Sequence, residues 1–370
     1  MGAYCDVPQA GFANSGTSWN VSHVASGSHL HNAPRRARPP QRNTPNLIVP
    51  GSPSEASRRA LLRQALGGMA VLAGGGAMAA DAGRAVAVVY PDLGEPFKQI
   101  FAAIVDGIEE RLRGNVASLA LGSAARPAEV AEDLRRRDVK VLIGLGRGGM
   151  RIAAALAGEL AVLVGCVVSV QESEARAFPV YTLAPDPALL LARLKRLMPG
   201  ARRVHLVYDP RLNGWLVRLA REAARAEGLE LLAQEAGDQA SALRLYSQLL
   251  AAADPVRDAL WLPQDPTTVD DNAVLSLVLK DGWNRSIAVF SSHLAHVKRG
   301  ALFSLYPDNA ELGRSLAASA LRLLGNPRAL APGVAPLRDT RAAINIRTAA
   351  HLGLDAAAAQ AGFDLVYPNG

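Results

Sequence analysis

Apolar residues from Gly83 onward follow two alternating patterns. Continuous apolar runs of strand length, such as Ala85–Tyr90, alternate with segments whose apolar residues recur at helical spacing, such as Pro96–Arg113. A continuous run indicates a strand buried on both faces, which is typical of a parallel sheet covered by helices. The pattern therefore predicts an α/β protein.

The alternation runs through two successive rounds, separated by a restart at Ala184–Asp186. In the first round, strands are predicted at Ala85–Tyr90, Val116–Leu121, Val139–Gly144, Ala161–Val168 and Val180–Leu183, with helices at Pro96–Arg113, Ala128–Arg137 and Met150–Gly158. In the second, strands are predicted at 203–208, 229–234, 258–262 and 286–291, with helices at 187–198, 212–227, 240–253 and 267–282. A TIM barrel would need eight equal units without this restart. The rounds therefore predict two doubly wound parallel-sheet lobes joined by a hinge.

The C-terminal part of the sequence predicts that the chain passes back to the first lobe and then again to the second. It reads as a strand at Ala301–Tyr306, a helix at Ala310–Gly325, an irregular stretch at Pro327–Pro336, a short strand at Ala342–Ile346 and a helix at His351–Gln360. We expect the 310–325 helix on the first lobe and the last strand on the second. The predicted lobes are therefore 83–184 plus about 305–330, and 185–304 plus about 335–370.

The first 82 residues do not share this rhythm. Residues 1–56 are rich in Ser, Asn, Pro and Gly without apolar periodicity, which predicts a disordered extension. Residues 57–82 combine Ser57-Arg58-Arg59, a weak apolar run and Ala77-Met78-Ala79, the layout of an export signal of twin-arginine type. An ordinary amphipathic helix that begins the fold is the alternative. With cleavage near Ala79–Ala82, we expect a periplasmic mature protein; a start of translation further downstream would explain the late position.

Charge and length narrow the class of protein. The chain has 370 residues and a net charge of +7, and the first 82 residues hold seven arginines against three acidic residues. More than half of the excess charge therefore precedes the predicted fold, which argues against a nucleic-acid-binding face. The longest apolar stretch, Ala65–Ala80, has sixteen residues with five glycines, too weak for a membrane span. We expect a mature protein that is not membrane-embedded.

One glycine-rich turn raises a nucleotide alternative. Gly144–Gly149 matches G-x-G-x-x-G between a predicted strand and helix, a context in which a helix N-terminus can bind phosphate. However, the turn follows the third strand, and Ser169–Glu172 stands where an acidic residue would end the next strand. A tight turn beside a ligand is the favoured interpretation. Arg147 within it could pair with a ligand carboxylate.

Candidate catalytic and metal groups do not form a pattern. His293 and His296 lie three apart without a third ligand nearby, so no metal site is predicted. Ser291-Ser292-His293 lacks the G-x-S-x-G elbow of hydrolases. The two cysteines, Cys5 and Cys166, lie on either side of the predicted cleavage site, so no internal disulfide is expected. We expect no cofactor and no enzymatic activity.

The predicted strand ends supply the candidate ligand contacts. In doubly wound sheets, ligands bind outside the carboxyl ends of the strands. The polar, aromatic and glycine residues at these ends are Tyr90, Pro91, Asp92, Gly146, Arg147, Ser169, Gln171, Asn213, Trp215, Gln264, Asp265, Ser291, Ser292 and His293. Aspartates such as Asp265 are also explained as helix caps. Because no catalytic constellation stands out, these residues favour capture of a small molecule over chemistry.

Several segments together resemble a known family. They are Pro96-Phe97…Gly107-Ile108, Leu142–Gly146, Leu197–Val204, Tyr208-Asp209-Pro210…Asn213, Ala259–Asp265, Gly300–Leu305 with Gly313-Arg314, and Ile344–Leu354. From about residue 84 to 370 the chain resembles the ABC-transporter substrate-binding proteins of the tryptophan/tyrosine-type subgroup. The resemblance implies a type I periplasmic binding fold, with two lobes joined by three crossings, at residue 184, 304–307 and the 330s, that close on a small ligand.

Departures from that family fall on the predicted pocket, at Tyr90–Leu93, Arg147 and Leu183–Pro185, so its ligand specificity is not carried over.

The expected function is a periplasmic solute-binding protein for ABC-type uptake through a permease, with an amino acid or related carboxylate as the ligand class considered. Alternatives are an orphan accessory of a membrane sensor or outer-membrane receptor, and a nucleotide-dependent enzyme that uses Gly144–Gly149. A repressor on the same module would need a helix-turn-helix ahead of the lobes, which residues 1–80 do not offer.

Overall fold

The computed structural model describes residues 84–122, 125–355 and 360–368. The predicted extension at 1–56 and export signal at 57–82 lie outside the described residues, so both stay predictions. Within the described ranges, no helix is both long and apolar enough to cross a membrane.

The first round of elements forms a wholly parallel six-stranded sheet, ordered β11-β5-β4-β3-β1-β2. Its strands are β1 (Val86–Pro91), β2 (Ala117–Leu121), β3 (Val141–Leu145), β4 (Ala161–Val167), β5 (Pro179–Pro185) and β11 (Gly333–Leu337). The helices that follow or cover them are α1 (Phe97–Leu112), α2 (Pro127–Arg136), α3 (Gly146–Leu156) and α9 (Asn309–Gly325), with a short 3-10 helix at Glu172–Ala175.

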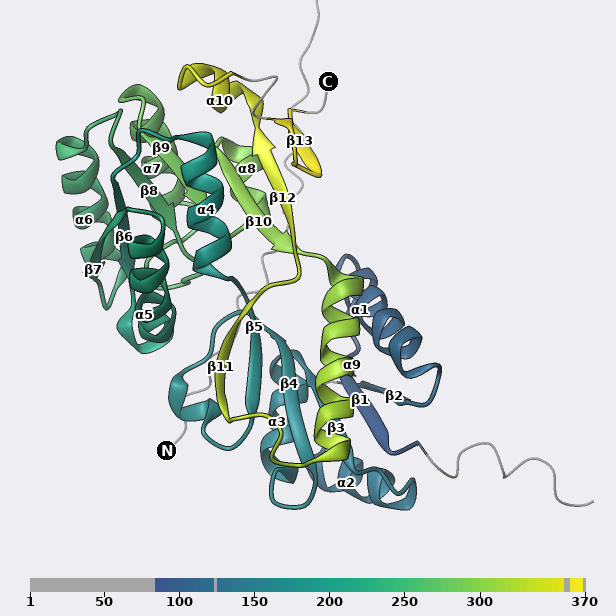
Figure 1. Cartoon of the computed structure of the whole chain (residues 1–370). Coiled ribbons are helices and arrows are strands. Elements are labelled where there is room, and N and C mark those ends of the chain that lie inside the picture. The colour runs from purple at the N-terminus through teal and green to yellow at the C-terminus, as the bar shows by residue number, and fades with distance from the viewer. Residues whose placement is uncertain (1–83, 123–124, 356–359, 369–370) are drawn as a thin grey trace, which may run out of the picture. The chain divides into compact units, whose positions relative to one another are not determined.

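The second round forms a seven-stranded sheet, ordered β13-β12-β10-β9-β8-β6-β7. Its strands are β6 (Arg203–Tyr208), β7 (Glu230–Glu235), β8 (Asp258–Leu262), β9 (Ala288–Ser291), β10 (Phe303–Pro307), β12 (Thr340–Asn345) and β13 (Leu365–Tyr367). Its helices are α4 (Pro187–Leu197), α5 (Pro210–Ala226), α6 (Gln239–Ala252), α7 (Val274–Asn284), α8 (Leu294–Arg299) and α10 (Ile346–His351). Figure 1 shows the two sheets with their helices.

Each sheet is buried on both faces, as the continuous apolar runs predict. In β1, Val86 and Val88 enter the core under α1 and α9, while Ala87 and Val89 enter the core under α2 and α3. In β8, fully buried Trp261 packs under α4 and α5. Its neighbours along the strand pack on the opposite face, under α6 and α7. Helices on both faces of two parallel-dominated sheets confirm the predicted fold class.

The chain passes between the sheets three times. Strand β5 leads from the first sheet into α4, β10 leads from the second sheet into α9, and β11 returns from the first sheet to β12. Helix α9 packs along α1 (Figure 1), at a separation that only glycine permits at Gly107 and Gly313. Strand β11 runs parallel beside β5, so two of the three crossings are paired with each other. The residue limits predicted for the lobes stay a prediction.

Two local predictions are wrong. The irregular stretch 327–336 contains β11, an edge strand whose half-buried residues make no apolar run. Helix α7 begins at Val274 rather than 267, because aspartate side chains hold the preceding residues in turns. In the second sheet, β12 runs antiparallel to β10, and the other paired strands run parallel. Helix α10 (Ile346–His351) is an additional helix, and the helix predicted at 351–360 stays a prediction because residues 356–359 lie outside the described chain.

Candidate functional site

The glycine-rich turn at the end of β3 is explained by close packing between strand and helix. A Cβ on Gly144 would lie 2.6 Å from the carbonyl oxygen of Gly149, and a Cβ on Gly149 would lie 2.6 Å from the carbonyl carbon of Gly144. Helix α3 begins at once at Gly146, whose φ of +66° is a left-handed conformation that suits glycine. Gly144, Gly146 and Gly149 are therefore required by the fold itself, whether or not a phosphate binds.

Arg147 is engaged by the protein at the same edge. Its guanidinium donates to Glu174 at 2.7 Å and to the carbonyl oxygen of Ser169 at 2.5 Å. Glu174 also accepts from the backbone of Gln171, which closes a capping box on the 3-10 helix. Arg147, Ser169 and Gln171 thus form one network at the carboxyl ends of β3 and β4. This network, rather than a free cation, is what a ligand would meet there.

Exposed apolar side chains gather at this edge of the first sheet. Of the nine large apolar residues exposed among the described ones, four directly follow a strand of this sheet or begin the next helix: Leu93, Phe97, Ile100 and Val168. Phe97 is 55% exposed although it belongs to the apolar pattern of α1. Exposed apolar side chains at the edge where such sheets bind ligands favour a binding surface there. Leu93 directly follows Tyr90, Pro91 and Asp92 in the chain, whereas Phe97 and Ile100 on α1 are not among the residues that the sequence predicts as ligand contacts.

Asp265 is a structural centre at the carboxyl edge of the second sheet. Its Oδ2 accepts from the backbone of Asp209 at 2.7 Å and from Asn213 Nδ2 at 2.9 Å. Its Oδ1 accepts from the backbone of Thr267 at 2.9 Å and of Thr268 at 3.2 Å. Only 3% of Asp265 is exposed. The carboxylate therefore ties the loops after β6 and β8 together and has little capacity left for a ligand.

Two further predicted contacts on α5 serve the fold. Asn213 is buried and donates its amide N–H to the Asp265 carboxylate. Trp215 is 6% exposed, packs in the core under α4 and α5, and donates its indole N–H to the carbonyl oxygen of Leu212 at 3.0 Å. Both residues hold α5 against the sheet, so their direct access to a ligand is small.

Gln264 leaves one acceptor without a partner at this edge. Its Nε2 donates to the carbonyl oxygen of Ser292 at 2.9 Å, which fixes the orientation of the amide. Its Oε1 is buried and makes no hydrogen bond within the described chain. Ser292 itself is buried and accepts from Trp261 Nε1 at 2.9 Å. An orphaned acceptor costs stability unless a donor meets it, so Gln264 Oε1 is a natural contact for an N–H or O–H group.

Ser291, His296 and Asp271 form a hydrogen-bonded chain after β9. Ser291 Oγ lies 2.8 Å from His296 Nδ1, and His296 Nε2 lies 3.3 Å from Asp271 Oδ1. Because a carboxylate only accepts, Nε2 carries the proton and Nδ1 accepts from the serine. Ser291 is fully buried, and its Oγ also accepts from the backbone of His293. The chain has the residue types of a hydrolytic triad, but its serine is closed to substrate and holds the turn at His293.

His296 should make stability depend on pH. Burial and the nearby His293 ring lower its pKa to about 4, although Asp271 acts to raise it. The unfolded histidine, with a pKa near 6.5, binds a proton that the folded one refuses, so stability is present above pH 6.5 and lost as pH falls toward 4. We expect a loss of roughly 2–3 kcal/mol over that interval. Urea unfolding at several pH values measures it.

The His296→Asn variant is the control for this dependence, since asparagine can keep a bond to Ser291 without titrating. Wild type should lose more stability than the variant between pH 6.5 and 4. The charged groups that face the histidine are Asp271 and Arg299, and His293 is its titratable neighbour. Equal pH slopes for wild type and variant would show that His296 does not cause the effect.

One ion pair joins elements that follow strands of the two different sheets. Glu172, in the 3-10 helix that follows β4, accepts from Arg218 of α5, which follows β6, at 2.6 Å. Both elements come directly after strand ends, one in each sheet. The predicted ligand residues of the two sheets therefore lie on edges that approach each other at this point. Being solvent-exposed, the ion pair is weak enough to open and close.

Metal and nucleophile chemistry find little support in the described residues. In ranges 84–122, 125–355 and 360–368, no group of three or more His, Cys, Asp or Glu side chains could hold a metal ion. Exposed His293 uses its Nδ1 to accept from the backbone of Ala295. Cys166 is buried, and burial raises the pKa of its thiol to about 12, so the reactive thiolate is disfavoured.

Comparisons with known proteins show the fold. No family model matches the chain, and no curated protein matches it. The ligand-free, open structure of CD0873, a substrate binding protein with adhesive properties from Clostridium difficile, matches with a TM-score of 0.54 at 16% identity, over 76% of this chain and 98% of that one. The chain therefore has a type I periplasmic-binding-protein-like fold.

Two weaker likenesses come from different functional classes. The ABC domain in complex with L-Trp from Streptococcus pneumoniae matches with a TM-score of 0.48 at 17% identity, over 76% of this chain and 99% of that one. The trehalose repressor from Escherichia coli matches with a TM-score of 0.40 at 15% identity, over 69% of this chain and 97% of that one. At such identities the likeness describes architecture, and the function has to be argued from the site.

Proposed function

We propose that this chain is a solute-binding protein that captures a small ligand at the carboxyl edges of its two sheets without converting it. The observation that carries the proposal is the group of exposed apolar side chains Leu93, Phe97 and Ile100 beside the end of β1. Exposed apolar surface is costly in water, and this edge is where doubly wound sheets bind ligands. The fold shared with a substrate-binding protein supports the same conclusion.

The two edges would suit a ligand with an apolar body and a hydrogen-bond donor. The first edge offers apolar surface, and the second offers the unpartnered acceptor Gln264 Oε1. Arg147 already pairs with Glu174, so a ligand carboxylate would have to compete for it. An amino acid or a related heterocycle combines these features. The buried residues Asp265, Asn213 and Ser291 would position the edge rather than touch the ligand.

Export and delivery belong to the same proposal. The predicted signal at 57–82 supports a periplasmic location, and an ABC permease would be the receiver of the ligand. A membrane sensor or an outer-membrane receptor is the alternative receiver. Either role uses capture between two hinged lobes, in which the ligand shifts the population toward the closed state.

The direct test is mass spectrometry of small molecules released from protein that was purified without refolding. We expect one compound in near-stoichiometric amount, which raises the melting temperature when it is added back. Conversion of that compound into a product by the purified chain would contradict capture without chemistry. Absence of any bound or stabilising compound across amino acids, heterocycles and nucleotides would also count against the proposal.

Phe97→Ser should weaken binding of that ligand by about tenfold or more, because the variant loses an aromatic contact that becomes buried in the complex. Isothermal titration calorimetry measures the affinity. Leu321→Ser, on the exposed side of α9, is the matched control: its side chain is 42% exposed and lies outside both edges. Both variants should fold normally. Equal affinities of the two variants would remove Phe97 from the site.

A further inference from the structure

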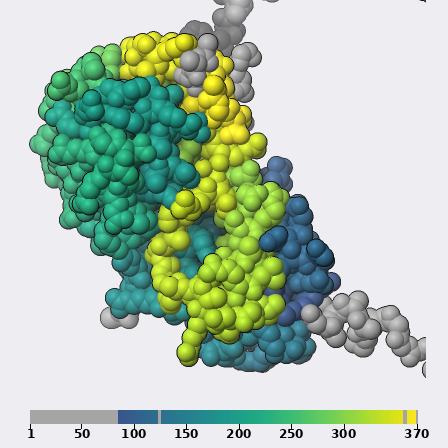
Figure 2. Space-filling model, in the orientation of Figure 1, coloured from purple at the N-terminus to yellow at the C-terminus, as the bar shows by residue number. Residues whose placement is uncertain are grey.

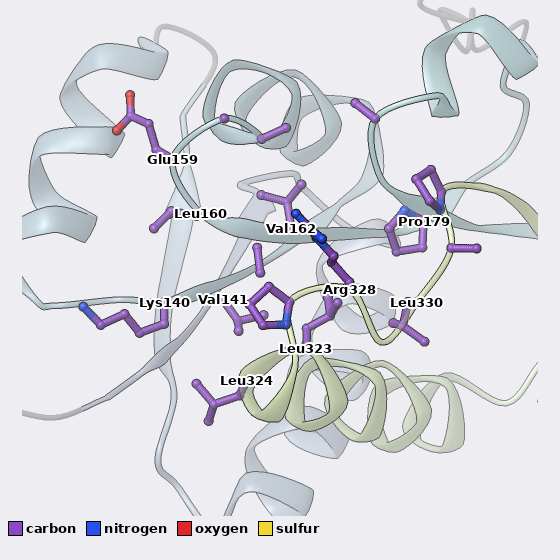
Figure 3. A pocket seen from close by; sticks show the side chains of 17 residues that line it. Lys140, Val141, Glu159, Leu160, Val162, Pro179, Leu323, Leu324, Arg328 and Leu330 are labelled. Atoms are coloured by element: carbon purple, nitrogen blue, oxygen red, sulfur yellow. The ribbon is translucent and has the colours of Figure 1, made fainter.

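The first sheet carries a pocket at its other edge, where the strands begin. Its volume is about 640 Å³, within the range of roughly 300–1,000 Å³ that small-molecule sites occupy. The starts of β3, β4 and β5, the segment after α3, and the end of α9 with the segment 327–332 form its walls (Figure 3). None of the fourteen predicted ligand residues lines it. The pocket is therefore separate from the candidate site described above.

The charged side chains of the pocket differ in what they contact. Lys140 pairs with Asp138 at 2.6 Å, and Glu159 pairs with Arg135 at 2.5 Å. Both point away from the centre of the view, whereas Arg328 lies across the middle of it (Figure 3). Within the described part of the chain, no hydrogen bond or ion pair engages the Arg328 guanidinium. The pocket thus presents one available cation.

The backbone around Arg328 is held in a defined turn. Asn326 Oδ1 accepts from the backbone N–H of Arg328 at 3.0 Å, and the carbonyl oxygen of Asn326 accepts from that of Ala329 at 2.9 Å. Arg322 of α9 donates to the carbonyl oxygen of Ala329 at 3.1 Å. The turn fixes where the Arg328 side chain starts, so a ligand would meet a partly organised cation rather than a free loop.

The remaining lining is mainly apolar. Val141 and Leu323 are buried in the core under α1 and α9, and Leu330 is partly buried against the same core, whereas Val162 is buried in the core on the opposite face of the sheet. A guanidinium beside such surface recognises a planar anion, because it can donate two parallel hydrogen bonds to a carboxylate or sulfonate. The last turn of α9 and the residues that directly follow α3 also line the pocket, and these helix ends carry a partial negative charge. A bidentate, charge-assisted pair is stronger than this exposed helix-end effect, so the net preference is for an anion.

We propose that this pocket is a second binding site, which takes a small amphiphilic anion with its acidic group on Arg328 and its apolar body against Leu330 and the end of α9 at Leu323. The site also touches the base of two crossings: Pro179 begins β5, and Pro332 immediately precedes β11. In the space-filling view, the surface of α9 and of the segment around β11 frames a hollow above teal residues of the first sheet (Figure 2). An occupant of the pocket would brace α9 against the starts of these paired strands.

Titration of the full chain with 1-anilinonaphthalene-8-sulfonate, followed by its fluorescence, tests the proposal. We expect saturable binding that Arg328→Gln weakens by about tenfold, while Arg328→Lys has a smaller effect. Arg151→Gln, at an exposed arginine of α3 outside the pocket, should bind as wild type does. N-phenyl-1-naphthylamine, which lacks the sulfonate, should bind wild type and Arg328→Gln equally. Melting temperatures of all variants verify folding, which the exposed position of Arg328 should preserve.

Three outcomes would overturn the proposal. The first is the absence of saturable binding of 1-anilinonaphthalene-8-sulfonate to wild type. The second is equal affinity of Arg328→Gln and Arg151→Gln for this dye. The third is loss of dye binding in Phe97→Ser but not in Arg328→Gln. The last result would place the dye at the carboxyl edge. Because Phe97 and Arg328 lie at opposite edges of the first sheet, failure of this proposal leaves the proposed solute site untouched, and the converse also holds.

Discussion

Replacing Asp265 with alanine is expected to lower the free energy of unfolding by about 3–5 kcal/mol. The carboxylate accepts four hydrogen bonds, from the backbone of Asp209, Thr267 and Thr268 and from the Asn213 side chain. With the acceptor removed, these donors lose their partner in a site where Asp265 is 3% exposed. Urea unfolding at pH 7 measures the change.

Asp106→Ala is the matched control for this prediction. Asp106 lies on the exposed face of α1, where loss of a carboxylate should change stability by about 0.5 kcal/mol or less. A second variant, Asp265→Asn, keeps the shape and one acceptor oxygen, so it should fall between wild type and Asp265→Ala. If Asp265→Ala unfolded like wild type but lost ligand binding, Asp265 would be a ligand contact rather than a structural centre.

Gly313→Ala should destabilise the chain by about 3 kcal/mol. A Cβ at Gly313 would lie 2.1 Å from the carbonyl oxygen of Ile104, and this backbone atom cannot move without shifting α1. The reciprocal contact is equally close, since a Cβ at Gly107 would lie 2.2 Å from the carbonyl oxygen of Ala310. The added methyl group must therefore push α9 away from α1. Thermal or urea unfolding measures the loss.

Gly148→Ala supplies the opposite expectation. Gly148 is also helical, in α3, but a Cβ there would meet nothing within 4 Å. Because alanine favours the helix over glycine, this variant should gain up to about 0.5–1 kcal/mol. Similar effects of the two substitutions would show that the approach of α1 and α9 is looser than the structure has it.

The polar residues at the strand ends fall into two groups with different roles. Asp265, Asn213, Ser291 and Trp215 are buried and bonded to neighbouring loops or helices, so they hold the shape of the edge. Exposed apolar residues and the free acceptor of Gln264 remain for a ligand. Conservative changes in the first group should lower the free energy of unfolding more than they weaken ligand binding. Changes such as Phe97→Ser should affect binding alone.

Hydrophobic periodicity was sufficient for most of the fold. The strands from β1 to β10 lie within a few residues of their predicted positions, because most of them are buried on both faces and show an unbroken apolar run in the local sequence. Strand β11 is interrupted by a proline, and strand β13 has only three residues, so neither shows a long apolar run. Each lies at an edge of its sheet and is only half buried, so its existence depends on the neighbour with which it pairs.

The sequence by itself determined the α/β class, the two rounds of elements and the strand ends at which polar residues collect, since each follows from local spacing of apolar and turn-forming residues. Only the tertiary structure decided which of those residues are available. Arg147 is paired with Glu174. The Asp265 carboxylate accepts hydrogen bonds from Asp209 and Asn213, which lie 56 and 52 positions earlier in the chain, and from the backbone of its own turn. Phe97 is left exposed by an otherwise buried helix pattern. Whether a side chain is free to contact a ligand depends on the partners that folding brings next to it. The linear pattern of apolar and polar residues gives no distances between such partners.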